Sequence, residues 1–241
     1  MASDRSAAMT TQSTSGTLQL RVQQAQLDYL GAFGRPALGL WGNTPRLLPT
    51  LYEKLADRAP NLSDYRIEGD ATAPATQGIL VQFGSRGNLR FTFERIEARA
   101  FDLTPDGLKF FEGVIRDIQT WLRESVPQSG FRSHLLSYSS HSLLPEGTSS
   151  SDYLRRLSTI ALRDLGANRG SGIVYHADLP DKHWRLQYTV DHSLAIEHGL
   201  YLQFALLAFA GDAEIGELRI GAETLFDTAL RQTGLSIEGR Q

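Results

Sequence analysis

Two histidines and an aspartate lie close together in one short stretch of the chain, VYHADLPDKHWRL, at residues 174–186. His176, Asp178 and His183 fall within eight positions of one another. Two imidazoles and a carboxylate form a ligand set that binds zinc or iron when the three side chains meet on one face. Whether they meet depends on the local fold of this stretch.

The residues around this stretch predict a β-hairpin in which GSGIVYHAD and HWRLQYTVDH are strands joined by LPDK. In the simplest pairing, Asp178 lies opposite His183 and His176 lies opposite Arg185. Alternation then places His176, Asp178 and His183 on the polar face of the hairpin, and the aromatic and aliphatic side chains on the other face.

Two interpretations of this polar face follow. In one, His176, Asp178 and His183 bind zinc or iron as the centre of a metal-dependent hydrolase or oxygenase. In the other, the face is solvated, Asp178 pairs with His183 and Arg185, and the protein has no cofactor. The second interpretation is favoured, because the three residues lack the helical HxxxH or HExxH spacing of common metal sites.

The composition excludes several other kinds of chemistry. The chain has 241 residues and no cysteine, which rules out disulfides, thiolate metal ligands and a cysteine nucleophile. Its net charge of −3 gives no overall attraction for the phosphates of nucleic acid. The sequence also lacks a GxSxG serine elbow, a GxxxxGK[ST] phosphate loop and a GxGxxG dinucleotide motif. These absences favour a non-enzymatic protein.

A local patch of basic side chains is the feature of this sequence that could bind the phosphates of RNA. Arg90, Arg95 and Arg99 recur along one segment, but Glu94 and Glu97 are interleaved with them. Such mixed charge is typical of a solvated surface. An RNA-binding or RNA-processing function therefore stays as an alternative, and nucleic acid is not the expected partner.

The first sixteen residues, MASDRSAAMTTQSTSG, are rich in serine, threonine and alanine, and we expect residues 1–16 to form a flexible tail. They lack the apolar core of a signal peptide. No run of the sequence approaches the roughly 18 consecutive apolar residues of a membrane-spanning helix. We therefore expect a cytoplasmic protein with no membrane contact.

From residue 17 onward the chain contains the same order of elements twice. Residues 17–126 predict a strand with a bulge near Gln23 and Gln24, a helix, a hairpin in which Val81 lies opposite Phe91, and a closing helix. Residues 131–236 predict a strand, a helix, a hairpin, an apolar strand and a helix. The expected fold is α+β, with two similar two-layer lobes of ferredoxin-like or related type, a repetition that suggests internal duplication.

The apolar strand LYLQFALLAFA, residues 200–210, carries large side chains on both of its faces. Leu202 and Phe204 belong to one face, and Ala205, Leu207 and Phe209 belong to the other. A strand of this kind is typically buried on both sides. We expect its second side to be covered by the other lobe or by a second copy of the chain.

The order of elements and the closing segment IGELRIGAETLFDTAL resemble those of a sporadically distributed, uncharacterised bacterial family with two similar α+β lobes. The resemblance covers nearly the whole chain from Leu18, and it implies no catalytic residue. The layout is more distantly similar to CRISPR repeat-RNA processing endonucleases, which also pair two ferredoxin-like lobes. The glycine-rich C-terminal loop of those nucleases is missing from the closing segment GLSIEGRQ.

These observations predict a non-enzymatic cytoplasmic binding or scaffold protein that acts through a protein partner or as a homo-oligomer. The expected binding surface is the exposed face of the sheet together with the apolar strand 200–210, because exposed apolar surface of this extent marks interaction sites.

Overall fold

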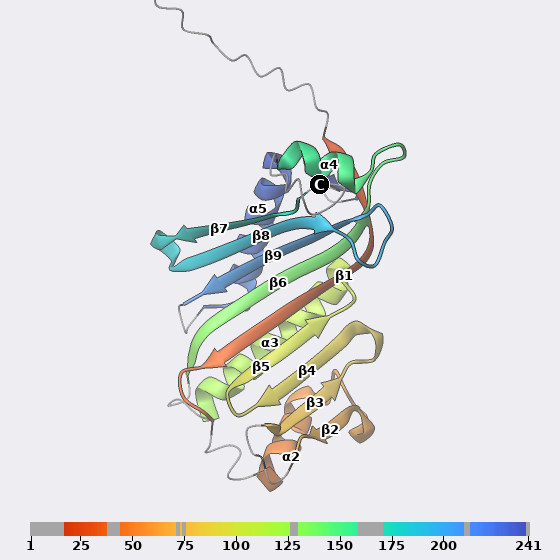
Figure 1. Ribbon diagram of the computed structural model, residues 1–241. Coiled ribbons are helices and arrows are strands. Elements are labelled where there is room, and N and C mark those ends of the chain that lie inside the picture. Colours follow the sequence, from red (N-terminus) through yellow and green to blue (C-terminus); the bar gives the residue numbers. More distant parts are fainter. Residues whose placement is uncertain are drawn as a thin grey trace, which may run out of the picture.

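The computed structural model describes residues 17–37, 44–70, 73, 76–125, 130–158, 171–209 and 213–239. The expected tail at residues 1–16 lies outside this part of the chain. Within it, the fold is α+β, as the sequence predicts (Figure 1). No helix in these residues has both the length and the hydropathy needed to cross a membrane.

The first strand, β1 (Leu18–Phe33), is sixteen residues long and lies near the middle of the sheet. Its side chains alternate, so that Leu27, Tyr29 and Phe33 are buried on one side. The pairing of β1 with its neighbour in the sheet shifts register between Val22 and Gln24, which confirms the predicted bulge.

The remaining elements follow in two similar series. The first series contains α2 (Thr44–Leu55), β2 (Tyr65–Glu68), β3 (Gly78–Gln82), β4 (Gly87–Thr92), β5 (Arg95–Ala100) and α3 (Pro105–Ser125). The second contains β6 (Phe131–Leu143), α4 (Ser150–Leu157), β7 (Ile173–Leu179), β8 (Trp184–His192), β9 (Leu200–Ala208), α5 (Ile215–Gln232) and β10 (Leu235–Ile237).

All of these strands belong to a single ten-stranded sheet, whose main path runs β2-β3-β4-β5-β1-β6-β9-β8-β7. Neighbours on this path are antiparallel, and β10 pairs in parallel with the start of β1. Twelve residue pairs join β1 to β6, so the strands of the two predicted lobes lie side by side. One lobe therefore does not cover the sheet of the other, so this alternative for strand 200–210 was wrong, and coverage by a second copy of the chain stays a prediction.

The helices pack on one face of the sheet. Helices α3 and α5 lie behind the strands in the view of Figure 1. On the inward side of the helices, Ile115 and Ile118 of α3 and Leu218 of α5 are completely buried. Phe204 of β9 is 2% exposed. Burying an aliphatic or aromatic side chain of this size stabilises a fold by about 1.5–3 kcal/mol. The hydrophobic core thus lies between the sheet and these helices.

Both predicted hairpins form, but each with a register two residues away from the expected one. In the first hairpin Val81 pairs with Leu89 instead of Phe91. The amide of Phe83 donates to the carbonyl of Gly87 at 2.9 Å, which closes the turn one residue earlier than expected. Gly87 has φ +151°, and a Cβ there would lie 1.9 Å from the carbonyl oxygen of Arg99. A slip of two residues keeps every side chain on its face, so alternation alone did not reveal it.

A small polar cluster is enclosed in this core beneath α3. The hydroxyl of Tyr29 lies 2.7 Å from Nδ1 of His134 and accepts a 3.0 Å hydrogen bond from Nε2 of Gln119. These three side chains are at most 1% exposed. Burial raises the pKa of the Tyr29 hydroxyl, the hydrogen bond from Gln119 being a smaller, opposing influence. The Tyr29 hydroxyl therefore stays protonated, and the hydrogen bonds of the cluster tie β1, β6 and α3 together.

We expect Tyr29→Phe to lower the free energy of unfolding by about 1–3 kcal/mol, because it removes the acceptor of a buried amide group. Urea denaturation of both proteins measures this difference. Tyr52→Phe is the matched control, since the Tyr52 hydroxyl donates to the carbonyl of Pro60 at the surface, and its effect should stay within about 0.5 kcal/mol. Equal effects at the two positions would contradict a special role for the buried cluster.

Candidate binding surface on the open face of the sheet

The face of the sheet opposite the helices is the open face. Side chains from neighbouring strands lie there in register across the whole sheet. The longest such row contains Asp178, Arg185, Leu207, Leu135, Leu30, Glu97, Arg90, Leu80 and Arg66, in order from β7 to β2. The row is apolar at its centre and charged on either side.

The centre of the row is a stripe of three leucines, Leu30, Leu135 and Leu207, on the adjacent strands β1, β6 and β9. We call it the leucine stripe. All three side chains are only half-buried. Among the described residues, the buried core lies on the other side of these strands. An apolar centre surrounded by polar groups is the usual anatomy of a protein-binding surface.

Sequence reasoning singled out Leu207 but not Leu30 or Leu135. The sequence contains only a weak sign of these two leucines as surface residues. Leu30 follows the buried Tyr29, and Leu135 precedes the buried Leu136, so each breaks the apolar–polar alternation of its strand. Only the pairing of β1 with β6 shows that the two leucines are neighbours.

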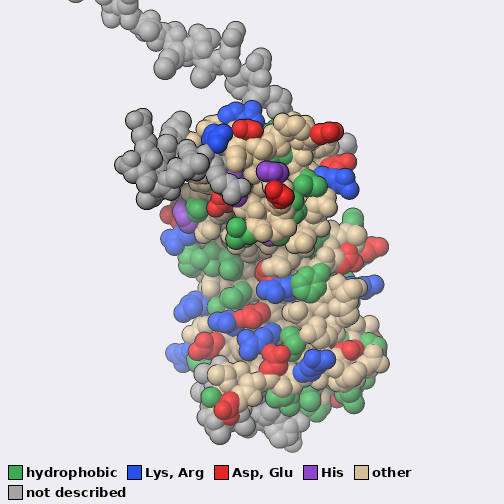
Figure 2. All heavy atoms as spheres, turned by 45° about the vertical axis from the view of Figure 1, so that its right-hand side comes forward, with side chains coloured by type: hydrophobic (Ala, Val, Ile, Leu, Met, Phe, Trp, Pro, Cys, Tyr) green, Lys and Arg blue, Asp and Glu red, His purple; other side chains and the backbone are tan. Residues whose placement is uncertain are grey.

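Ion pairs occupy the charged part of the open face. Arg99 pairs with Asp28 at 2.6 Å, and Arg90 lies 3.2 Å from a carboxylate oxygen of Glu68. The other candidate for an RNA-binding patch, Arg95, pairs with Glu97 at 2.5 Å. Arg90 also lies 3.8 Å from Glu97 of the neighbouring strand β5, so each of the three arginines is offset by at least one carboxylate of the sheet. Basic and acidic side chains are accordingly interleaved on the surface seen in Figure 2.

In the described residues, the three side chains of the predicted metal site do not form a group that could hold a metal ion. Leu179 pairs with Trp184, so the connection of the hairpin is residues 180–183 rather than LPDK, and Asp178 lies opposite Arg185 instead of His183. Asp178 accepts a 2.8 Å hydrogen bond from Arg185. His183 adopts a left-handed conformation with φ 52°, at the end of the turn that Pro180–Lys182 forms.

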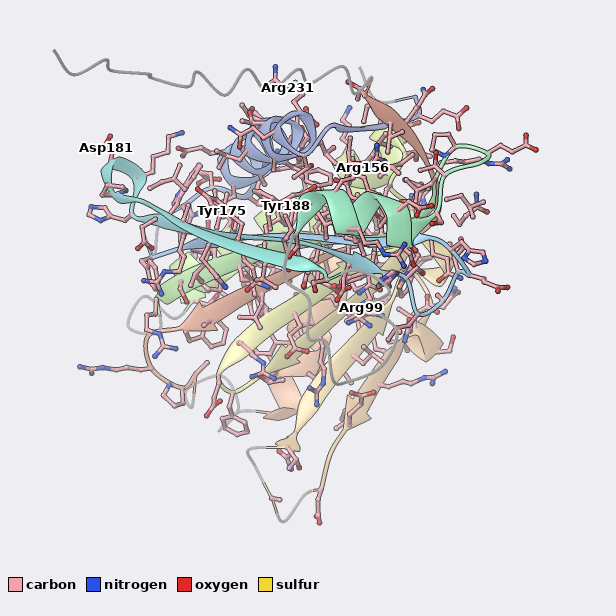
Figure 3. The ribbon with its side chains drawn as sticks, turned by 45° about the horizontal axis from the view of Figure 1, so that its top comes forward. Arg99, Arg156, Tyr175, Asp181, Tyr188 and Arg231 are labelled. Atoms are coloured by element: carbon pink, nitrogen blue, oxygen red, sulfur yellow. The ribbon has the colours of Figure 1, made fainter. Side chains whose placement is uncertain are left out.

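The turn, marked by Asp181 in Figure 3, projects away from α4 at the tip of the hairpin. His176 and Asp178 remain on the open face of β7, with His176 opposite Gln187. In the described part of the chain, no three histidine, aspartate or glutamate side chains are grouped so that they could hold a metal ion. The physical reason for the difference is the helical turn at Pro180, which takes His183 out of the strand.

Strand β7 forms an edge of the sheet, and the pattern of hydrogen bonds shows which of its amides point outward. The amide of Phe209 donates to the carbonyl of His183, and the amide of Ser193 donates to that of Gly199. Odd-numbered residues of β8 thus bond to β9, and even-numbered ones bond to β7. In the register of this hairpin, the amides of Val174, His176 and Asp178 then point away from β8.

This edge also exposes apolar surface. Val174, whose side chain lies on the open face, is 57% exposed, and Tyr175, whose side chain lies on the helical face, is 58% exposed. Figure 3 shows Tyr175 on the hairpin strand next to the one that carries Tyr188. Because α5 covers Tyr188 through Phe226 and does not reach as far as Tyr175, only the inner tyrosine is buried.

Comparison of the sequence with protein-family profiles and with curated proteins gave no match. Among solved structures, one similar chain is a rolling circle replication initiator protein from Geobacillus stearothermophilus. The two chains share 8% identity over 87% of this chain and 80% of the other, with a TM-score of 0.29. A TM-score this low does not establish a common fold, and we base no functional argument on it.

The two hairpin histidines should respond oppositely to the same substitution. His183→Gly removes the cost of a left-handed conformation, about 1–2 kcal/mol, against the extra entropy that glycine brings to the unfolded chain. We expect stability to stay equal or to rise by up to about 1 kcal/mol. The matched control, His176→Gly in extended β7, should lose about 0.5–1 kcal/mol. Thermal unfolding measures both, and a larger loss at His183 would contradict the observed turn.

Proposed function

We propose that this chain is a non-enzymatic cytoplasmic scaffold protein that self-associates through β7 and binds a protein partner on the open face of its sheet. The observation that carries the proposal is the outer edge of β7, with its three outward amides and its exposed Val174 and Tyr175. Unpaired edge strands are templates for pairing with another chain, and pairing of this kind is a common mode of protein association.

The sequence of β7 suits pairing with a second copy of itself. In an antiparallel pairing centred on Ala177, His176 lies opposite Asp178 of the partner subunit, and the same contact occurs twice. An imidazole N–H can donate a hydrogen bond to a carboxylate directly across a strand pair, and such polar pairs are favourable. On the helical face, Tyr175 lies opposite Leu179 of the partner subunit, which gives the exposed ring an apolar neighbour. A pairing centred on His176 would instead place two imidazoles face to face.

Such a dimer would present both open faces on the same side. The two-fold axis of an antiparallel strand pair within one sheet is perpendicular to that sheet. Both leucine stripes therefore face the same direction, flanked by the ion pairs of the open face. A protein partner that lies across the junction would contact two equivalent apolar centres. This arrangement supports a scaffold that holds its partner by avidity.

We further propose that the chain arose by internal duplication of a ferredoxin-like or related unit, with one copy at residues 17–126 and the other at 131–236. The series β1, α2, β3, β4, β5 and α3 has the same order as β6, α4, β7, β8, β9 and α5. Each series also adds its strands to the sheet in the same order, outward from β1 on one side and from β6 on the other. Strands β2 and β10 are additions to this pattern.

We expect the purified chain to sediment as a dimer of about twice 26.7 kDa. His176→Glu places like charges opposite each other at two symmetric positions, which should weaken the dimer about tenfold. His176→Lys, the matched variant, should strengthen it or leave it unchanged, because lysine lies opposite Asp178 of the partner subunit. Sedimentation at several protein concentrations measures all three dissociation constants.

A backbone variant provides the second test of the same edge. His176→Pro removes an amide that points outward and leaves the bonds to β8 in place, so we expect a folded monomer. Circular dichroism checks the fold. A strictly monomeric parent chain at tens of micromolar would overturn self-association, and a dimer that none of the three variants alters would overturn the assignment to β7.

A further inference from the structure

An apolar cavity of about 450 Å³ lies on the helical side of the sheet, between α3 and α5. Leu27, Leu136 and Phe204 form its floor on β1, β6 and β9, while Leu108 of α3 and Phe226 of α5 line its walls. Cavities of about 300–1,000 Å³ between helices, with mostly apolar linings, are the usual sites for small ligands. The cavity lies where the two halves of the sheet meet, on the face opposite the leucine stripe.

Small side chains and one irregularity of β1 keep this space open. Ala25 and Ala222 line the cavity at positions where a larger side chain would fill it. Val22 lines it as well, although Val22 and Ala25 are three positions apart and would point to opposite faces of a regular strand. The bulge between Val22 and Gln24 adds one residue and brings both side chains to the helical face.

The charges at the cavity are unequal. Arg219 is the cationic group of the lining in the described part of the chain. It is engaged on two sides, because its Nε bonds to Glu112 and its Nη1 lies 2.6 Å from Glu223. Glu223 and Glu238 both line the cavity. Among the described residues, Glu238 has no ion-pair partner. The lining residues that the structure describes hold one guanidinium and two carboxylates, and Glu112 outside the lining also bonds to that guanidinium, so the cavity mouth carries excess negative charge.

We propose that this cavity binds a small molecule with an apolar body and one protonated amine, the class of hydrophobic primary amines. The apolar body occupies the space above Leu27, Leu136 and Phe204, and the ammonium group lies at Glu238 and Glu223. An anionic head group is disfavoured, because Arg219 already has two carboxylate partners and the neighbouring charges repel an anion. This inference does not depend on the proposed function, because the cavity lies on the other side of the sheet.

Three ligands with the same ten-carbon chain separate the contributions of the apolar body and of the charge. Isothermal titration of the full chain with decylammonium, decanol and decanoate, each below its micelle concentration, should show one site per chain for decylammonium. We expect decylammonium to bind at least about tenfold more tightly than decanoate, with decanol between them. Equal affinities, a preference for decanoate, or uptake of several molecules per chain would overturn the proposal.

Variants of the lining assign the binding to this cavity. Glu238→Gln should weaken decylammonium about fivefold and leave decanol unchanged, as expected for the loss of one partly exposed charge contact. The matched control is Glu53→Gln on the exposed surface of α2, which should change neither ligand. A decylammonium affinity that stays the same in Glu238→Gln would contradict the assigned position of the amine.

Filling the cavity provides the final test. Ala222→Leu should abolish the binding of decylammonium and decanol, because the added carbons occupy the ligand's space. If Ala222→Leu does not fold, as judged by circular dichroism, Ala25→Leu fills the same cavity from β1. Undiminished binding in a folded filled variant would show that the ligands bind elsewhere and would overturn the proposal.

Discussion

The pairing of β1 with β6 is the interaction on which the rest of the structure depends. These two long strands share twelve residue pairs, and every other strand of the main sheet is added outward from one of them. Because both series of helices pack on the same face, the pairing also brings α3 beside α5, and none of the described helices covers the opposite face. The core, the leucine stripe and the apolar cavity all lie along this central pair, so each of them is made from both halves of the chain.

Local sequence pattern predicted most of the elements, but it missed β5 and β10 and did not give the mutual positions of the elements. The change of phase near Gln23 revealed the bulge, because alternation records directly which side chains face inward. The registers of the two hairpins could not be predicted from alternation, because a slip of two residues leaves the same side chains facing inward. The turn conformations at Gly87 and His183 determine which register forms. The predicted metal site was lost for that reason. The leucine stripe depends on which strands become neighbours, and no local pattern around Leu30 or Leu135 records that.

The two faces of the sheet use polar groups in different ways. On the open face, charged side chains pair across strands in contact with water, where each pair contributes little to stability but controls which surfaces can approach. On the helical face, the polar cluster of Tyr29, His134 and Gln119 is buried away from water, so its hydrogen bonds are made within the core. Exposed charged side chains therefore serve specificity on one face, and buried polar side chains serve a defined packing on the other.

The bulge in β1 has a consequence for how this protein can vary. Side chains of a regular strand alternate between two faces. Adding or removing one residue therefore moves every side chain between that point and the end of the strand to the other face. At residues 22–25, substitutions adjust the size of the cavity by a few carbons. The bulge already holds one extra residue, so deletion of Gln23 would leave Val22 and Ala25 two positions apart in a regular strand, with both side chains still on the helical face. The bulge is thus the place in β1 where the chain can lose one residue and still keep the lining of the cavity.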